Sequence, residues 1–438
     1  MACKIVQCGY MSGDTFAAAA LLAVDPGVEI ILVKDTKATG QYADKTKHIL
    51  KIYTESGVVG RVKLLDISGS KVTIEDLWKS VSKAYKDGYS LPDMRSADAL
   101  VNYQLQLCHS FEPKRAWPRS ITAVTGLLAN IWESNPEAAR AAVARAWKVG
   151  KLPPEQQRAL FDYMNQVFAK TNVNMRKNIV VLWSRKSGKR GGAHLELDSS
   201  YKGIRQLAWN FAEVDKRSTV LLAGDESNFK MEQYARNELQ IVNVTNMWDA
   251  PVWKDVFGDA TFLAQFAFYK YLAIDYNVVH VGMRSGMLEA MALLGMQTFY
   301  LEGHGSGSGE RMLAFSHAGI TYTRVQIEDA PSLTGRISES QKLFTKESVD
   351  QAVARLAKAN KERSGFQRNF AGHNVKDTDT DWAAKNYAKA KLLGKALDDQ
   401  SYNRGRHWDN MAGDMRAKRG FTNDSVDRIV KLVTGTFT

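Results

Sequence analysis

The chain has 438 residues, of which 45% are hydrophobic and 24% are charged, so it is a folded globular protein rather than a disordered one. This length predicts two or three domains. Lys and Arg (59) outnumber Asp and Glu (47), and the formal net charge of +12 favours anionic partners such as nucleotides, phosphorylated sugars, nucleic acid or acidic membranes.

Several protein classes are excluded by simple patterns. No apolar run approaches the roughly 20 residues that a membrane helix needs. The first residues lack the apolar segment of a secretory signal, and we expect a cytoplasmic protein. Cys3, Cys8 and Cys108 form no C-x-x-C pair, which predicts buried thiols rather than disulfides or a zinc site. Zinc-finger spacing and heptad-linked basic regions are absent, so no motif indicates nucleic acid as a partner.

The first 33 residues have the pattern of a doubly wound α/β domain. We expect a strand over 3–8, a helix over 15–24 and a second strand over 28–33. The loop over 9–14 would follow the carboxyl end of the first strand, where ligands bind in such sheets. It lacks the G-x-G-x-x-G spacing, so it is either a plain tight turn or a different kind of ligand loop.

A mostly helical block is expected over 96–171. Apolar residues at 3.6-residue spacing predict helices over 121–132, 136–147 and 154–168. Residues 100–108 are ambiguous, because their apolar side chains alternate as in a strand. The block fits either a helical insertion or a small helical subdomain.

A second set of parallel strands is expected in the second half of the chain. The predicted strands cover 178–183, 218–223, 239–244, 277–281, 298–301 and 322–327. Helices over 201–211 and 262–274, and a helix after Gly286, alternate with them. We therefore expect two Rossmann-like, doubly wound domains: an N-terminal domain over 1–177 and a second over 178–345. Helices and a basic tail would follow over 346–438.

Three loops of the second half would meet at one edge of that sheet, because each follows a strand. One is cationic and glycine-rich (184–192), one contains Asp225, and one continues through Arg284 into a helix that carries Glu289. Positive charge and a helix N-terminus suit a pyrophosphate, and a carboxylate suits ribose hydroxyls. The alternative is that these are ordinary loops and Glu289 is solvated.

The order of these segments resembles the donor-binding domain of GT-B glycosyltransferases, most closely the family 4 type. The resemblance is carried by Ser184-Arg185, Lys202-Gly203-Ile204, the strand ending in Gly224-Asp225, and Leu288-Glu289-Ala290-Met291-Ala292. It spans about 120 residues. It implies a nucleotide diphosphate sugar as donor, UDP- or GDP-linked, and a metal-independent transfer that needs no cofactor. In that family the residues matching Arg185 and Lys202 bind the pyrophosphate and the one matching Glu289 binds the ribose.

We therefore expect a donor site made of Arg185, Lys186, Lys189, Lys202, Gly203, Asp225, Arg284, Ser285, Gly286 and Glu289. The family usually has a further glutamate eight residues before the one that matches Glu289, which helps to hold the donor sugar, and here that position is Val281. Candidate general bases for the acceptor are Asp14, His194 and Glu196, each of which is equally an ordinary solvated loop residue.

Two functions follow from this pattern. The first is a glycosyltransferase acting on an anionic or otherwise unidentified acceptor. The second is a non-catalytic binding or assembly protein on a degenerate GT-B scaffold, including one associated with nucleic acid. Val281 and the basic tail favour the second. No metal is expected, and the Asp-Thr-Asp at 377–379 is interpreted as helix capping.

Overall fold

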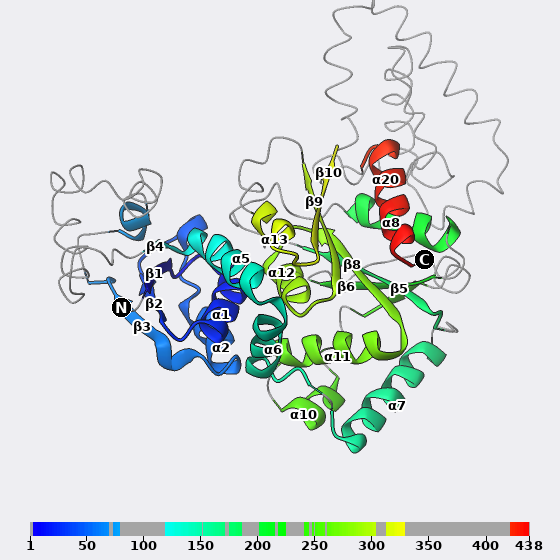
Figure 1. Ribbon diagram of the computed structural model, residues 1–438, viewed down its shortest axis with the longest axis horizontal. Helices are drawn as coiled ribbons and strands as arrows, with labels where there is room; N and C mark the ends of the chain where they lie inside the picture. Colours follow the sequence, from blue (N-terminus) through cyan, green and yellow to red (C-terminus); the bar gives the residue numbers. More distant parts are fainter. Residues whose placement is uncertain are drawn as a thin grey trace, which may run out of the picture. The chain divides into compact units, whose positions relative to one another are not determined.

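The computed structural model shows a mixed α/β protein (Figure 1). It describes residues 3–69, 73–78, 119–150, 152–170, 175–185, 201–214, 218–224, 241–244, 248, 250–258, 261–303, 312–328 and 421–437. The ambiguous segment 100–108, the predicted helices over 346–396 and the basic tail over 401–420 lie outside these ranges.

The first sheet is formed by four parallel strands near the N-terminus. They are β1 (Cys3–Cys8), β2 (Val28–Lys34), β3 (Val62–Asp66) and β4 (Arg119–Ser120), in the order β3-β2-β1-β4. β1 pairs with β2 from Cys3↔Val28 to Cys8↔Val33, and β2 pairs with β3 from Ile30↔Val62 to Lys34↔Asp66. Because the strands are parallel, their connections must cross over the sheet, and helices supply most of these crossovers.

Helix α1 (Thr15–Val24) is the centre of this part of the chain. Its residues from Thr15 to Leu22 are all buried, and Ala18, Ala19, Ala20, Leu21 and Leu22 have no exposed surface. It packs against β2 and against four helices, namely α2 (Thr46–Glu55), α5 (Val124–Ser134), α6 (Pro136–Ala146) and α12 (Gly286–Leu293). Four consecutive alanines make this close approach sterically acceptable, because a methyl group adds little bulk.

The second sheet contains six strands in the order β10-β9-β8-β5-β6-β7. Their bounds are Asn178–Ser184 for β5, Ser218–Gly224 for β6, Ile241–Asn243 for β7, Asn277–Met283 for β8, Gln297–Gly303 for β9 and Tyr322–Ile327 for β10. If β5 to β10 are numbered 1 to 6 in chain order, the sheet starting from β7 has the strand order 3-2-1-4-5-6. This is the order of dinucleotide-binding sheets. The fold class expected from the sequence, two Rossmann-like parallel sheets, is confirmed.

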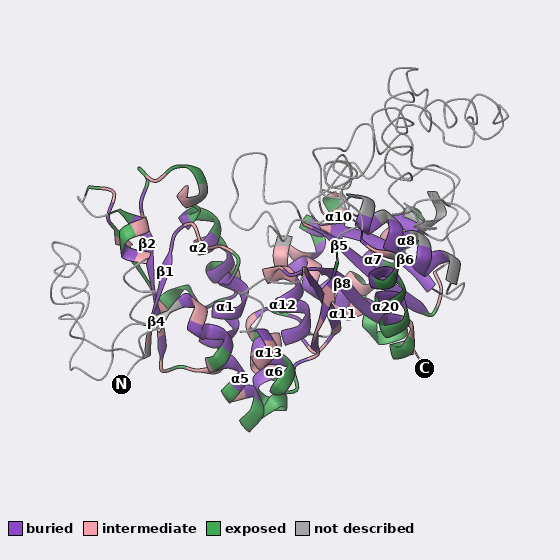
Figure 2. Ribbon diagram, turned by 90° about the horizontal axis from the view of Figure 1, so that it is seen from above, coloured by how far each residue is buried: buried purple, intermediate pink, exposed green. Residues whose placement is uncertain are grey.

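Burial explains why these strands read as apolar runs. Every residue of β5 is buried, and so are six of the seven in β8 and in β6 (Figure 2). Strands covered on both faces need hydrophobic side chains at successive positions rather than at alternate ones. Helices α8 (Tyr201–Val214), α10 (Pro251–Phe257), α11 (Thr261–Asp275), α13 (Leu313–His317) and α20 (Asn423–Thr434) accompany this sheet, and α7 (Pro154–Lys170) precedes it.

The chain divides into two compact units, each made of several segments. The first comprises Met1–Val167, Arg185–Asp198 and Val244–Arg324, and the second comprises Phe168–Ser184, Ser199–Asn243 and Val325–Thr438. The domain boundaries expected at 177 and 345 stay predictions.

An aromatic cluster lies within the first unit. Phe16 of α1 makes edge-to-face contacts with Trp147, Phe262 and Phe266, at centroid distances of 6.3, 5.6 and 5.4 Å. Trp147 and Trp132 are buried core residues. Cys8 is a buried free thiol, and its burial raises its pKa to about 12.

The structure differs from the sequence prediction in three respects. The block over 96–171 contains strand β4, which pairs with β1 through Ile5↔Arg119 and Val6↔Ser120 and is too short to show any periodicity. β8 continues to Met283 rather than ending before Gly282, because that glycine pairs with Tyr300 of β9. Helix α10 was not predicted, whereas α20 lies within the range 346–438, where helices were expected.

The described residues include no helix that is both long and apolar enough to cross a bilayer. Within the same ranges, no group of three or more His, Cys, Asp or Glu side chains is arranged to hold a metal ion.

His280 gives the second sheet a specific sensitivity to acid. The side chain, in the middle of β8, is fully buried and lies edge-to-face on Tyr269 with ring centroids 5.0 Å apart. Burial lowers its pKa from 6.5 to about 3, so the unfolded chain binds a proton in this window while the folded chain does not. Stability due to this residue should therefore fall by ~1.4 kcal/mol per pH unit as the pH decreases from 6.5 towards 3.

Thermal unfolding of wild-type protein and His280→Leu between pH 7 and pH 4 measures this effect. The wild-type Tm should fall more steeply with decreasing pH than that of the variant. Parallel curves for the two proteins would show that His280 is not a buried neutral histidine.

Candidate functional site

The carboxyl ends of β5 and β8 each continue into an arginine, and the two arginines are in direct contact. Arg185 follows β5, and its Nη1 donates to the backbone carbonyl of Arg284, which follows β8, at 2.9 Å. The backbone N–H of Arg284 donates to the carbonyl of Leu301 in β9 at 3.2 Å. Strands in the 3-2-1-4-5-6 order bind ligands outside these two carboxyl ends. The structure thus brings together two of the residues predicted to bind the donor.

Helix α12 begins immediately after Arg284. Ser285 occupies the N-cap position with extended backbone angles, and its side chain accepts from the backbone N–H of Leu288 at 3.4 Å. A serine in this position fixes the start of the helix, because it satisfies one N–H group that has no partner within the helix. The remaining first-turn N–H groups and the helix dipole make such an N-terminus favourable for an anion.

The first residue of α12 lies against the loop that follows β1. A Cβ added to Gly286 would be 2.3 Å from the backbone carbonyl oxygen of Gly13 and 3.4 Å from the Phe16 ring. Only a glycine allows the backbone of α12 to approach this loop so closely. The next residue after Gly13 is Asp14, the N-cap residue of α1, which is 8% exposed. The candidate base Asp14 therefore belongs to the loop that meets the α12 N-terminus.

The side chains of Arg284, Glu302 and Arg324 form a group of ion pairs, which we call the Glu302 cluster. Glu302, at the end of β9, has no exposed surface. Its Oε1 is 3.3 Å from Nε of Arg284, and its Oε2 is 3.0 Å from Nε of Arg324 in β10. Tyr300 and Tyr322 are stacked beside these ion pairs, with ring centroids 4.3 Å apart, and burial raises the pKa of both phenols.

Glu289 lies on the buried side of α12. The residue is 3% exposed, and its charge contributes to raising the pKa of Tyr322. It therefore lies near Tyr300 and Tyr322, beside the Glu302 cluster. Val281 has no exposed surface and is a core residue of β8.

The other predicted site residues are placed as follows. Gly203 lies in α8 of the second unit, where an added Cβ would be 2.7 Å from the ring of Phe421, so this glycine also serves the packing of the C-terminal segment. Lys202 precedes it in the same helix, of which only the backbone is described at that position. Outside the described residues lie Lys186, Lys189, His194, Glu196 and Asp225.

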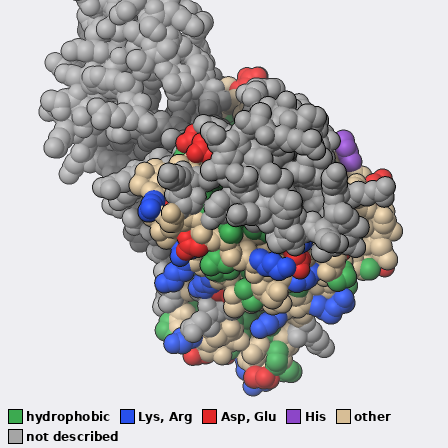
Figure 3. Space-filling view, turned by 90° about the vertical axis from the view of Figure 1, so that its left-hand side faces the viewer, with side chains coloured by type: hydrophobic (Ala, Val, Ile, Leu, Met, Phe, Trp, Pro, Cys, Tyr) green, Lys and Arg blue, Asp and Glu red, His purple; other side chains and the backbone are tan. Residues whose placement is uncertain are grey.

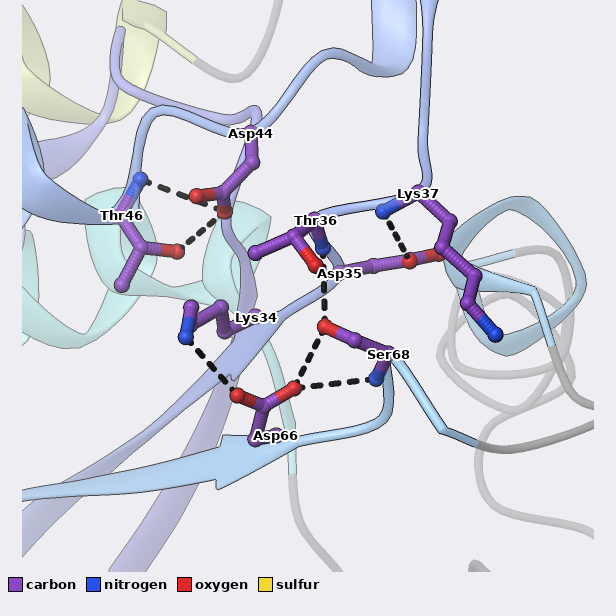
Figure 4. A network of polar contacts seen from close by, with 8 residues as sticks. All are labelled: Lys34, Asp35, Thr36, Lys37, Asp44, Thr46, Asp66 and Ser68. Atoms are coloured by element: carbon purple, nitrogen blue, oxygen red, sulfur yellow. Dashed lines mark hydrogen bonds and ion pairs between the residues drawn. The ribbon is translucent and has the colours of Figure 1, made fainter.

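The carboxyl edge of the first sheet carries a second polar network (Figure 4). Lys34 donates to Asp66 at 2.8 Å, the N–H of Thr36 donates to Ser68 Oγ at 2.9 Å, and hydrogen bonds from Lys34 and Ser68 lower the pKa of Asp66. Asp35 accepts from the N–H of Lys37 at 3.0 Å and from that of Ile74 at 3.3 Å. These contacts fix the loops that follow β2 and β3.

Exposed lysines surround this edge of the first unit. Lys37, Lys45, Lys47 and Lys51 are exposed on the loop after β2 and on α2. Basic and acidic side chains are interspersed on the part of this side that Figure 3 displays, and basic ones are the more frequent. A surface of this kind attracts anions over a distance of about a Debye length.

No protein-family model matches the chain, and no curated protein sequence matches it. Among solved structures, the chain is similar to the ADP-heptose LPS heptosyltransferase II of E. coli, with 12% sequence identity and a TM-score of 0.31. The match covers 74% of this chain and 90% of that one.

Glu302 and Arg324 were not among the residues predicted from the sequence. Both are single charged residues within or at the end of apolar strands, and this is the only signal that could have pointed to them. Their partnership joins residues of different strands, which spacing along the chain does not reveal.

The contact between Gly286 and Gly13 can be tested from its two sides. Gly286→Ala should lower stability by ~1–3 kcal/mol, because the new methyl group overlaps a backbone carbonyl that cannot rotate away. Gly13→Ala is the matched control, since a Cβ there has nothing within 4 Å. Thermal unfolding measures the stability of both variants. Equal Tm values for the two variants would contradict the close approach of α12 to this loop.

Proposed function

We propose that the chain is a glycosyltransferase that uses a nucleotide diphosphate sugar as donor and requires no bound metal. The observation that carries this proposal is the hydrogen bond from Arg185 to the carbonyl of Arg284, at the start of α12. It brings the Arg185 guanidinium to the backbone just before α12, so that a guanidinium group and a helix N-terminus lie together at the carboxyl ends of β5 and β8. A diphosphate is the ligand class that suits such a set, because each component stabilises negative charge.

In this proposal the site acts on the leaving group. Cleavage of the bond between the anomeric carbon and the diphosphate oxygen leaves additional negative charge on the diphosphate. Arg185, Arg284 and the first-turn N–H groups of α12 would stabilise that charge without reorganisation, which is the usual source of large rate effects. Lys202, with Lys186, Lys189 and Asp225, completes the predicted donor site, and Glu289 would have to turn outwards to reach the ribose.

The acceptor would be held at the carboxyl edge of the first sheet. Asp14 is the candidate base that the described chain supports best, because Gly13 beside it meets the first residue of α12. It would take the proton of the acceptor hydroxyl as that oxygen attacks the anomeric carbon. His194 and Glu196 remain alternative candidates. The exposed lysines on the loop after β2 and on α2 favour an anionic acceptor.

A second candidate function is a non-catalytic binding or assembly protein on the same scaffold, including one associated with nucleic acid. Val281 favours it, because this buried strand residue occupies the position where the family carries a glutamate that holds the donor sugar. Such a protein would bind polyanions with a steep dependence on salt and without competition from nucleotides.

A thermal-shift screen against UDP, GDP, ADP and CDP and their sugar conjugates separates the two functions. A ligand at about 100 times its dissociation constant should stabilise the protein by ~2.7 kcal/mol, and Arg185→Ala and Arg284→Ala should abolish that shift. Arg158→Ala, on the exposed face of α7, is the control and should leave it unchanged. Slow hydrolysis of the stabilising nucleotide sugar would support the enzyme. No shift with any nucleotide would reject the donor site and favour the binding protein.

A further inference from the structure

The guanidinium of Arg284 forms an ion pair with a carboxylate that has no exposed surface. Glu302 is completely buried, and each of its two oxygens faces a different arginine, Oε1 facing Arg284 and Oε2 facing Arg324. A buried carboxylate is tolerated only when charged or hydrogen-bonding partners compensate it, so this arrangement strongly restricts the positions of both arginine side chains.

The strands impose the same geometry. Tyr300 and Glu302 are two residues apart in β9, and Tyr322 and Arg324 are two apart in β10, so each pair lies on one face of its strand. The stacked rings of Tyr300 and Tyr322 therefore cover the ion pairs from one side. Excluding water here strengthens the interaction between Glu302 and the guanidinium groups.

The backbone of Arg284 is held independently of its side chain. Its N–H donates to Leu301 in β9, and its carbonyl accepts from Arg185. With the backbone fixed at both sides, the remaining freedom of Arg284 lies in its side-chain torsions, and Glu302 restricts those through Nε.

We propose that Glu302 is a positioning residue, which holds Arg284 in the orientation that receives the diphosphate of the ligand. This inference rests on the proposed function, because the diphosphate site is part of it. Glu302 acts through Arg284 and does not contact the ligand itself. A guanidinium fixed in advance loses little conformational entropy on binding, and this raises affinity.

Positioning by Glu302 and simple electrostatics predict opposite changes in diphosphate affinity when Glu302 is replaced. Removing the negative charge of Glu302 makes the site more positive, which by Coulomb attraction alone would tighten the binding of an anion. If Glu302 acts by positioning, its removal weakens binding instead, because Arg284 is no longer held. Two variants separate the effects: Glu302→Gln removes the charge, whereas Glu302→Asp keeps the charge and withdraws it by one methylene.

The test is calorimetric titration of the wild-type protein, Glu302→Gln and Glu302→Asp with inorganic diphosphate, UDP and GDP. Whichever probe binds the wild type should bind both variants about 10-fold more weakly. This is the effect of losing one charge-assisted hydrogen bond between the protein and the ligand. Glu29→Gln is the matched control, because it removes one negative charge from the ion pairs with Lys4 and Lys63 on the first sheet. It should change the affinity by less than about 2-fold. Unchanged or tighter binding by both Glu302 variants would overturn the proposal.

A second measurement keeps this result separate from the fate of the proposed function. The ¹H–¹⁵N signal of the Arg284 Nε–H, assigned by comparison with Arg284→Lys, should exchange slowly with solvent in the wild type and rapidly in Glu302→Gln. If no probe binds the wild type, the proposed donor site is wrong, while this signal still reports whether Glu302 holds Arg284. Equal exchange rates in the two proteins would show that it does not.

Discussion

The approach of α12 to the loop after β1 is the contact on which the candidate site depends. It requires a helix, α1, that is buried on every side and made largely of alanine, so that four other helices can pack around it. It also requires glycine at position 286, since any Cβ there would overlap the carbonyl of Gly13. Without this approach, Asp14 and the N-terminus of α12 would not lie in the same region of the first unit.

Charges in this region are arranged in advance of any ligand. Arg284 and Arg324 share the buried carboxylate of Glu302, and Arg185 is fixed on the backbone carbonyl of Arg284. Burying charges in this way costs solvation energy that tight pairing has to offset. The consequence is a set of dipoles and guanidinium groups that need not reorganise when a negatively charged group arrives. The buried ion pairs of Glu302 are thus unfavourable for solvation but favourable for the proposed binding of a diphosphate.

Most of the fold could be predicted from the sequence, for a physical reason. β1, α1 and β10 begin and end at the predicted residues, because continuous apolar runs and an alanine-rich segment are local signals. β4 was missed because two residues, Arg119 and Ser120, become a strand only by pairing with β1. The contact between Arg185 and Arg284 could be expected from the sequence, because both residues directly follow strands of one sheet. Glu302 and Arg324 could not, because their pairing depends on the order of the strands. The burial of Glu289 depends on how α12 packs, which periodicity does not determine.

A crystal structure of the protein with the nucleoside diphosphate selected by the thermal-shift screen tests the central claim most directly. We expect the diphosphate to lie at the first turn of α12, within hydrogen-bonding distance of Arg185 and Arg284, while both Glu302 ion pairs remain in place. A diphosphate bound elsewhere, for instance on the exposed lysines of the first sheet, would contradict the proposed donor site. So would a complex in which Arg284 leaves Glu302 to reach the ligand.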